Sequence, residues 1–512
     1  MRYFFYVYLL VFNINFLSAQ EIQSPSRIDE IVVTAEFNDI DAYNISSSIS
    51  VISGNDISKR NANHLEDLLF ITPNVNYSSG ASRGKFYQIR GIGERSEFTE
   101  PVNYSVGVII DGIDFTGIAL GASTFDVKQV EILRGPQGTL YGANALAGLI
   151  NIVSNDPTED FYSEISGSIS EFGGKDFGII ISNSNDNNFG YRLGFKNSKS
   201  DGFVKNVYLN RDDTNDIDET ISRAKFTKNN DTTKLTLNIF YADIDNGYDA
   251  FSLDNTRTTY SDEPGYDRQK TTAASTKFEK TLRNNNTIEI LASFSDSELG
   301  YAYDEDWSNT GICEKTPCDS TLFGFDWWYS SFDSFNRDNT NHSIDLRYIS
   351  NSENINWVVG LYNRDQDINL IRKYTYLQND FKSSFDTRNS AIYGQFTNNF
   401  TNKIKFQAGL RYEDRRADYL DNNGPVPEGF FCIEIYPRPD SCLFDNKYSK
   451  SENFWGGQIS LQNQIIENTM IYALLSRGYK PGGVNIDGQI SQQNLNYDSE
   501  TMWNYELGIK TN

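Results

Sequence analysis

The sequence is poor in the residues and motifs from which most enzyme sites are built. Its 512 residues include only two histidines, His64 and His342, and four cysteines. It contains no nucleophile elbow, no phosphate-binding loop, no HExxH motif and no CxxC motif. A formal net charge of -24, with no local run of Lys or Arg, argues against a nucleic-acid partner because the phosphates would be repelled. We therefore expect a protein that binds or transports, and not an enzyme.

Long apolar runs are also missing beyond the N-terminus. Residues 1–19 contain one early basic residue, Arg2, an apolar run over residues 4–12 and small residues before Gln20. This pattern predicts a secretory signal peptide cleaved after Ala19, with a retained membrane anchor as the alternative. No later segment approaches the roughly 18 consecutive apolar residues of a membrane-spanning helix. A mature chain that lies in a membrane must therefore cross it as β-strands.

Aromatic residues, by contrast, are abundant. The chain has 31 Tyr and 34 Phe, aromatics make up 14% of it, and only 38% is hydrophobic. Transmembrane barrels combine aromatic girdles at the membrane interfaces with a polar lumen, so their average hydropathy looks soluble. The mean hydropathy of -0.52 is therefore compatible with a membrane barrel.

Residues 160–512 carry the alternation typical of barrel strands. Runs of roughly ten residues alternate apolar and polar side chains, separated by Asn, Asp, Gly and Ser. The apolar positions include Leu235, Leu237, Ile239, Tyr241, Ile344, Leu346, Tyr348, Leu410, Tyr412, Trp503, Tyr505, Leu507 and Ile509. The charged alternate positions must face a wet lumen, because Lys or Arg at mid-depth in lipid costs about 2–4 kcal/mol. A soluble two-sheet sandwich could show the same alternation, but it does not explain the aromatic strand ends.

Residues 126–153 form the most ordered motif of the chain. Apolar residues enter a small core on either side of a Gly135-Pro136 turn, and Gly138 and Gly142 permit backbone conformations closed to other residues. The run resembles the plug-domain signature of TonB-dependent outer-membrane receptors. The signature positions here are Glu131, Arg134, Gly135, Pro136, Gly138, Tyr141 and Gly142. The resemblance implies an α+β plug domain followed by an antiparallel transmembrane β-barrel.

The resemblance covers nearly all of residues 41–157, the predicted plug domain. We expect a strand at residues 49–52, a helix capped at Asn55-Asp56 and an amphipathic helix at residues 64–70. Two buried strands are expected at residues 86–93 and 106–113. We expect His64 on the helix surface, because no nucleophile or partnered acid beside it indicates a catalytic base. Glu131 and Arg134 are candidates for ion pairs between plug and barrel wall, with plain surface solvation as the alternative.

Residues 20–40 contain a short strand-forming segment with no partner strand adjacent in sequence. It resembles the TonB box, which offers an exposed edge to the periplasmic protein TonB, so that main-chain hydrogen bonds give affinity. The alternative is an ordinary first strand of the plug. The box residues are Glu30, Ile31, Val32, Val33, Thr34 and Ala35.

Two segments near the end, residues 476–485 and 500–510, resemble barrel segments of the same family. Plugged outer-membrane transporters have about 22 strands, whereas roughly 14 candidate strands follow residue 160. We therefore predict an incomplete barrel in a C-terminally truncated sequence, with a smaller barrel as the alternative.

Two long loops and one plug loop are the expected ligand-binding regions. Their aromatic side chains could stack on a flat ligand, and their arginines could meet an anionic ferric chelate. The candidates are Tyr77, Arg83, Arg95, Tyr301, Tyr303, Trp307, Trp327, Trp328, Phe431 and Arg438. Trp327 and Trp328 could instead belong to the interfacial girdle.

The four cysteines fall in two local pairs, Cys313 with Cys318 and Cys432 with Cys442. In an exported chain this spacing favours two loop disulfides among the three pairings that are formally possible. We expect no metal site, because neither histidine lies beside a cysteine in sequence.

The resemblance implies energised uptake of a scarce nutrient across the outer membrane of a Gram-negative bacterium. The expected partners are TonB with its inner-membrane energising complex, outer-membrane lipid and lipopolysaccharide, and a small-molecule ligand bound by a monomer. A ferric siderophore is the leading substrate, carried as cargo without a resident cofactor. An oligosaccharide, cobalamin or haem remains open, as does a passive porin or adhesin-like barrel.

Overall fold

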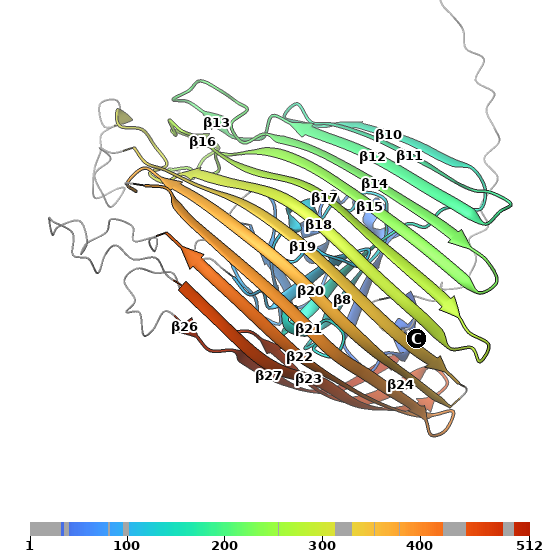
Figure 1. Ribbon diagram of the computed structural model, residues 1–512. Helices are drawn as coiled ribbons and strands as arrows, with labels where there is room; N and C mark the ends of the chain where they lie inside the picture. The colour runs from blue at the N-terminus through green and yellow to red at the C-terminus, as the bar shows by residue number, and fades with distance from the viewer. Residues whose placement is uncertain are drawn as a thin grey trace, which may run out of the picture.

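The chain folds into an N-terminal plug and a large curved wall of β-strands (Figure 1). The computed structural model describes residues 32–34, 40–79, 82–95, 102–253, 255–312, 330–352, 354–377, 379–422, 447–484 and 496–511. Within these ranges, no helix is both long and apolar enough to span a membrane.

The core of the plug is a five-stranded sheet of order β3-β8-β9-β6-β7. Its strands are β3 (Ile49–Ser53), β8 (Val127–Arg134), β9 (Gly148–Ser154), β6 (Val106–Ile110) and β7 (Ile113–Asp114). Only β6 and β9 pair in parallel, and the other neighbours are antiparallel. The continuous apolar runs of β8 and β9 fit this arrangement, because both faces of these strands are covered.

Short helices and a hairpin surround this sheet. The elements are α1 (Gly54–Lys59), α2 (Glu66–Leu69), β4 (Val75–Ser78) and β5 (Phe86–Ile89), with short 3-10 turns η1 (Ala42–Asn44), η2 (Ala119–Gly121) and η3 (Gly142–Asn144). The predicted cap of α1 was misplaced, because the Oγ of Ser53 accepts the hydrogen bond from the Asp56 amide.

His64 is not a helix-surface residue, and that prediction was wrong. It precedes α2, is buried, and places Nε2 3.2 Å from the carbonyl oxygen of Leu120. Burial lowers the pKa of its imidazole, since the charged form would lose its hydration. The residue therefore joins α2 to the plug core.

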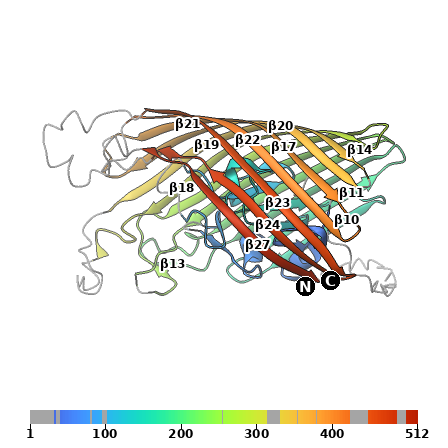
Figure 2. The same ribbon diagram turned by 90° about the horizontal axis from the view of Figure 1, so that it is seen from below.

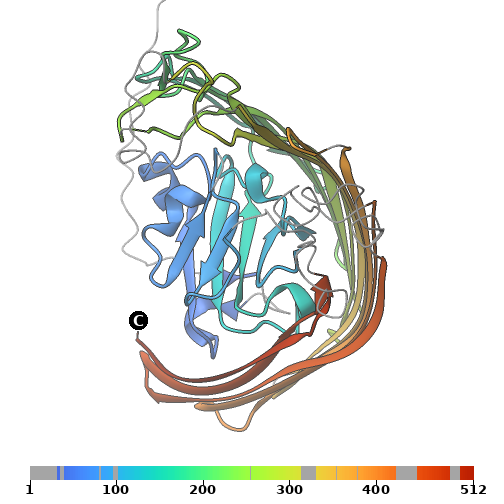
Figure 3. The same ribbon diagram turned by 90° about the vertical axis from the view of Figure 1, so that its left-hand side faces the viewer.

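The wall is a single antiparallel sheet of 14 strands, which agrees with the predicted strand count. They are β10 (Tyr162–Ile169), β11 (Lys175–Ser184), β12 (Phe189–Ser200), β14 (Ile217–Asn229), β15 (Thr233–Tyr248), β17 (Gly265–Thr281), β18 (Thr287–Asp304), β19 (Phe332–Asn351), β20 (Ile355–Tyr374), β21 (Phe381–Asn399), β22 (Ile404–Asp421), β23 (Lys447–Ile466), β24 (Thr469–Lys480) and β27 (Glu500–Thr511). The strands run obliquely (Figure 2), and the sheet curves around the plug, which lies against its concave face (Figure 3).

The predicted alternation is confirmed along these strands. Leu346 and Leu410 leave 41% and 58% of their surface exposed on the convex face. Their strand neighbours Asp345 and Arg411 are buried on the concave face at 6% and 1%. The concave face is therefore charged and packed against the plug, as a polar lumen requires.

The two ends of the wall differ in the length of their connections. Short turns such as residues 230–232 join strands at one end, and long connections such as residues 305–331 join them at the other. Outer-membrane barrels place short turns on the periplasmic side and long loops outside. We therefore name these the inner end and the outer end.

Candidate functional site

The box segment lies against the plug, near the inner end. Strand β1 (Val32–Val33) pairs antiparallel with β2 (Ile40–Asp41), and Val33 is fully buried with Leu133 and Leu149. The inner-end location follows from the next residues, because Lys405 on the wall donates to the carbonyl of Asn44. The prediction of an exposed strand without a partner was wrong for the described residues 32–34.

A buried carboxylate fixes the end of this segment. Oε1 of Glu131 accepts hydrogen bonds of 2.8 Å from both the amide and the hydroxyl of Thr34. Gln129 and Asn151 also donate to Glu131, and Gln129 donates to the carbonyl of Val32. Hydrogen bonds to a charged group are each stronger than neutral ones, so this network latches the box to the plug. We call these four contacts of Glu131 the box latch.

Both predicted charged candidates make hydrogen bonds within the plug and box. Glu131 serves the box latch, and Arg134 donates to the carbonyl of Pro73 and the hydroxyl of Ser50. These contacts differ from the predicted ion pairs with the wall.

Other charged residues join plug and wall instead. Most plug partners are acids and most wall partners are bases, so each part neutralises the other. The pairs are Glu94–Lys480, Asp111–Arg223, Asp111–Lys225, Asp114–Arg364, Asp126–Arg192 and Asp156–Lys225, with the reverse polarity at Arg83–Glu219, Lys85–Asp267 and Arg90–Glu506. None of these pairs was predicted, although Arg83 was named as a candidate. Local spacing in the sequence does not relate a plug residue to a wall strand far along the chain.

The glycines of the signature are needed where plug and wall touch. Gly138 does not have a left-handed backbone; a Cβ there would lie 2.8 Å from the carbonyl oxygen of Arg477 and 3.4 Å from the Cα of Gly456. Gly142 has a φ of +65°, and a Cβ there would meet the Glu413 carboxylate. Glycine is needed at position 138 because the wall backbone approaches closely. At position 142 it is needed both for the close approach and for the left-handed backbone conformation.

Replacing Gly142 with Ala should therefore cost more than the same change at Gly91. Gly91 has a φ of +81° with nothing within 4 Å, so Gly91→Ala adds only backbone strain of about 1–2 kcal/mol. Gly142→Ala adds a clash on top, worth a further ~1–3 kcal/mol. Thermal unfolding of the two purified variants measures this difference. Equal losses would show that the clash at the wall is absorbed without strain.

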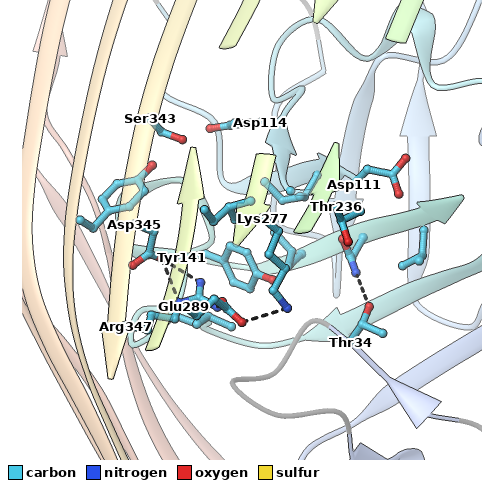
Figure 4. A pocket seen from close by; sticks show the side chains of 18 of the residues that line it. Thr34, Asp111, Asp114, Tyr141, Thr236, Lys277, Glu289, Ser343, Asp345 and Arg347 are labelled. Atoms are coloured by element: carbon cyan, nitrogen blue, oxygen red, sulfur yellow. Dashed lines mark hydrogen bonds and ion pairs between the residues drawn. The ribbon is translucent and has the colours of Figure 1, made fainter. Parts of the chain in front are cut away.

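A cavity of about 370 Å³, lined by both polar and apolar side chains, lies between plug and wall. Its plug side includes Thr34 and Asp111, and its wall side includes Lys277 and Arg347 (Figure 4). Both wall cations bind Glu289, at 2.9 and 2.8 Å. The polar side chains of this lining suit ordered water. Thr34 of the box segment forms part of the lining of this cavity.

The outer end carries a cluster of aromatic side chains facing the lumen. Tyr301 lies at its centre, 5.5 Å from Tyr248 and 6.3 Å from Phe335 between ring centroids. The other aromatic members of this outer aromatic cluster are Phe381, Phe385, Tyr419 and Tyr448, with Tyr303 packed against it. Of these residues, only Tyr301 and Tyr303 were predicted as ligand-binding candidates. The others could have been found from their lumen-facing position in the alternation and their place near the outer end of a strand.

Three arginines border this cluster, and one of them, Arg337, lies 5.3 Å from the ring centroid of Phe335. Arg372 lies 5.0 Å from the ring centroid of Phe335 and pairs with Asp333, whose Oδ2 also accepts from Tyr303. Arg415 lies 5.8 Å from the ring of Phe385. Aromatic faces and guanidinium groups at one place can bind a flat or anionic ligand.

The remaining predicted ligand residues are distributed differently. Trp307 is partly exposed and stacks on Phe251 at 4.6 Å, and Arg95 is exposed. Tyr77 packs edge-on against Phe70. Arg83 is held by Glu219 and Glu66; burial alone would lower its pKa, but these carboxylates raise it above the ordinary value. Arg83 therefore anchors the plug apex to the wall.

Comparison with known proteins identifies this architecture. Residues 41–149 match the TonB-dependent receptor plug domain, and residues 166–512 match the TonB-dependent receptor-like β-barrel. The chain belongs to the TonB-dependent receptor family. Such receptors are proteins of the Gram-negative outer membrane that interact with TonB. This receptor is likewise an outer-membrane protein.

Some relatives resemble this receptor over most of its length and others over a part of it. The pesticin receptor of Yersinia pestis is 22% identical over 501 residues, covering 95% of this chain and 69% of that protein. The vitamin B12 transporter BtuB of Vibrio vulnificus is 30% identical over 159 residues, which are 31% of this chain and 25% of the transporter. The ferric yersiniabactin uptake receptor FyuA from Yersinia pestis has a TM-score of 0.73 at 19% identity, covering 91% of this chain and 70% of that one.

Several predicted positions of the receptor lie outside the described residues. They are the signal peptide, Glu30, Ile31, Ala35, Cys313, Cys318, Trp327, Trp328, Phe431, Cys432, Arg438 and Cys442. Their predicted roles stay predictions. His342 lies within β19, with its ring 5.0 Å from that of Phe294.

Proposed function

We propose that this receptor takes up a ferric siderophore across the outer membrane, powered through TonB. The observation that carries the proposal is the pairing of two sites at opposite ends: the outer aromatic cluster with its arginines, and the latched box at the inner end. The ligand would be cargo, and we infer no resident cofactor and no catalytic step. Several solved relatives are siderophore receptors by name, including FyuA and PiuA from Acinetobacter baumannii.

Uptake in this proposal is a shift between two states of the box. In the latched state, Glu131 accepts two hydrogen bonds from Thr34, and Thr34 forms part of the lining of the cavity. A ligand that binds the released state more tightly raises the population of free box, which then pairs with TonB. We propose a monomer surrounded by lipid and lipopolysaccharide, with TonB and its inner-membrane energising complex as partners.

Growth of a receptor-deleted host under iron limitation tests this function. The host carries this receptor with or without residues 30–35, and it is given a panel of ferric siderophores. Rescue by one chelate that disappears with the box deletion is the expected result. Deletion of residues 20–25, which leaves the box in place, is the control.

Cobalamin is the second candidate, favoured by the 30% identity to a vitamin B12 transporter. The same strains are therefore grown with cobalamin as the limiting nutrient. Rescue there, and none with any ferric chelate despite verified membrane insertion, would replace the siderophore assignment.

A further inference from the structure

Three carboxylates meet at the outer end, away from both the box and the centre of the aromatic cluster. Asp304 ends β18, Asp306 follows it, and Asp262 lies in the connection between β16 (Thr258–Thr259) and β17. One oxygen from each carboxylate lies within 4.8 Å of the others. Opposite ligands of a calcium ion at 2.3–2.6 Å would be about 4.6–5.2 Å apart, so the separation suits one shared cation.

Hydrogen bonding leaves one oxygen of each buried carboxylate free. Oδ1 of Asp304 accepts from the amides of Asp306 and Trp307, at 3.2 and 3.0 Å. Oδ1 of Asp306 accepts from the amide of Ser331 at 2.9 Å. Oδ2 of Asp304 and Oδ2 of Asp306 are buried without a hydrogen-bond partner. Each carboxylate is thus oriented by backbone amides with its second oxygen left for another ligand.

A serine hydroxyl provides a second sign of a ligand. The side chain of Ser261 faces the carboxyl of Asp304 and is only 2% exposed, yet its Oγ has no hydrogen-bond partner of good geometry. The Oγ of Ser308, next to the same turn, is also buried without a partner. A buried hydroxyl without a partner loses its hydration, and a cation coordinated by its oxygen would remove this penalty.

Charge gives the third argument. Asp304 and Asp306 are 6% and 1% exposed, and none of the described Lys or Arg residues forms an ion pair with them or with Asp262. Other buried acids of the wall, such as Asp333 and Glu413, have an arginine partner. Glu131 and Asp249 instead accept several hydrogen bonds from side-chain amides and hydroxyls. Buried carboxylates in contact repel one another strongly unless a cation or a proton intervenes.

We propose that Asp262, Asp304 and Asp306 bind a calcium ion. Calcium suits an all-oxygen site built on loops, because it accepts variable geometry and carboxylate ligands, whereas magnesium demands a near-ideal octahedron. The ion joins the Asp262 connection to the turn after β18, with which it already shares a hydrogen bond from the Asp262 amide to the Ser308 carbonyl. Sequence analysis expected no metal site because it considered only cysteine and histidine.

The site has a structural consequence for the outer end. Trp307 donates its amide to Asp304 and stacks on Phe251, so the ion would order a surface beside the outer aromatic cluster. This inference goes beyond the proposed function, because cation binding is measured without any transported ligand.

Binding of terbium and calcium to the purified, detergent-solubilised receptor tests the proposal. After removal of divalent cations with EDTA, we expect saturable terbium luminescence that calcium displaces at lower concentration than magnesium. Asp306→Asn and Asp304→Asn should each weaken calcium at least about tenfold, because each removes one ligand charge. Asp212→Asn, at an exposed acid of another outer connection, should leave affinity unchanged.

Three outcomes would overturn the site. They are no saturable binding to the parent protein, equal calcium affinity in Asp306→Asn and the parent, or stronger displacement by magnesium. The altered electrophoretic mobility of the unheated barrel verifies folding of each variant. The competition between calcium and magnesium uses only the parent protein, so it decides the proposal even if a variant fails to fold.

Discussion

Ligand-free receptor carrying Glu131→Ala should bind the periplasmic domain of TonB at least about tenfold more tightly than the parent protein, a change of ~1.4 kcal/mol. The substitution removes the acceptor of both hydrogen bonds from Thr34. Hydrogen bonds to a charged group contribute about 1.5–3 kcal/mol each, so the released state of the box gains population. Apparent affinity rises with the fraction of receptor that is competent to bind.

Hydrogen exchange separates this effect from general loosening of the plug. The amides of Val33 and Thr34 should lose protection in Glu131→Ala, while those of β6 keep theirs. Lys128→Ala is the control, because Lys128 lies on the same strand with its side chain exposed in a surface pair with Asp156. Faster exchange at Thr34 without tighter TonB binding would show that the latch does not limit access to the box.

The second large effect is expected at Arg411 on β22. Its guanidinium is 1% exposed and pairs at 2.7 Å with Glu413, which also accepts from Asn389 and Tyr479. Arg411 donates to the carbonyl of Leu140 in the plug as well. Arg411→Met leaves Glu413 as a buried charge without its cation, and the receptor should lose about 3–5 kcal/mol of stability. Chemical unfolding of the purified protein measures the loss.

The same strand supplies a matched comparison. Arg416 pairs with Asp418 at the same two-residue spacing, but the side chains are 65% and 40% exposed. Exposed pairs contribute about 0–1 kcal/mol, so Arg416→Met should change little. Adding Glu413→Leu to Arg411→Met should restore part of the loss, because the orphaned carboxylate is removed. If both single variants lose the same stability, the buried pair is not an anchor of the plug.

The wall was predictable because period-two alternation reports burial residue by residue. The alternation alone predicted that Leu346 and Leu410 lie on the face opposite the polar lumen, and both are exposed on the convex face. The plug strands were predictable for a related reason, since β8 and β9 are apolar runs bounded by turn residues. The prediction for His64 was wrong because its burial depends on contact with the Leu120 carbonyl, which lies 56 positions away in sequence.

The functional contacts were harder to predict for the same physical reason. Thr34 and Glu131 are 97 positions apart, and local sequence carries no record of their meeting. The box was therefore predicted to be exposed, although the structure buries Val33. Gly138 was noticed as a glycine, but its purpose lies in the approach of Gly456 across the wall. Asp262 and Asp304 likewise come together only through the register of separate strands.

The plug–wall ion pairs also determine which charges the wall would expose if the plug were displaced. Arg192 on β12 and Arg223 and Lys225 on β14 take their carboxylate partners from the plug, including Asp126 and Asp111. If those acids moved away, Arg192, Arg223 and Lys225 would present unpaired positive charge on neighbouring strands. Such charge would attract an anionic ligand and repel a cationic one. In the resting receptor, the plug carboxylates therefore occupy the positions where an anionic ligand would meet these basic side chains.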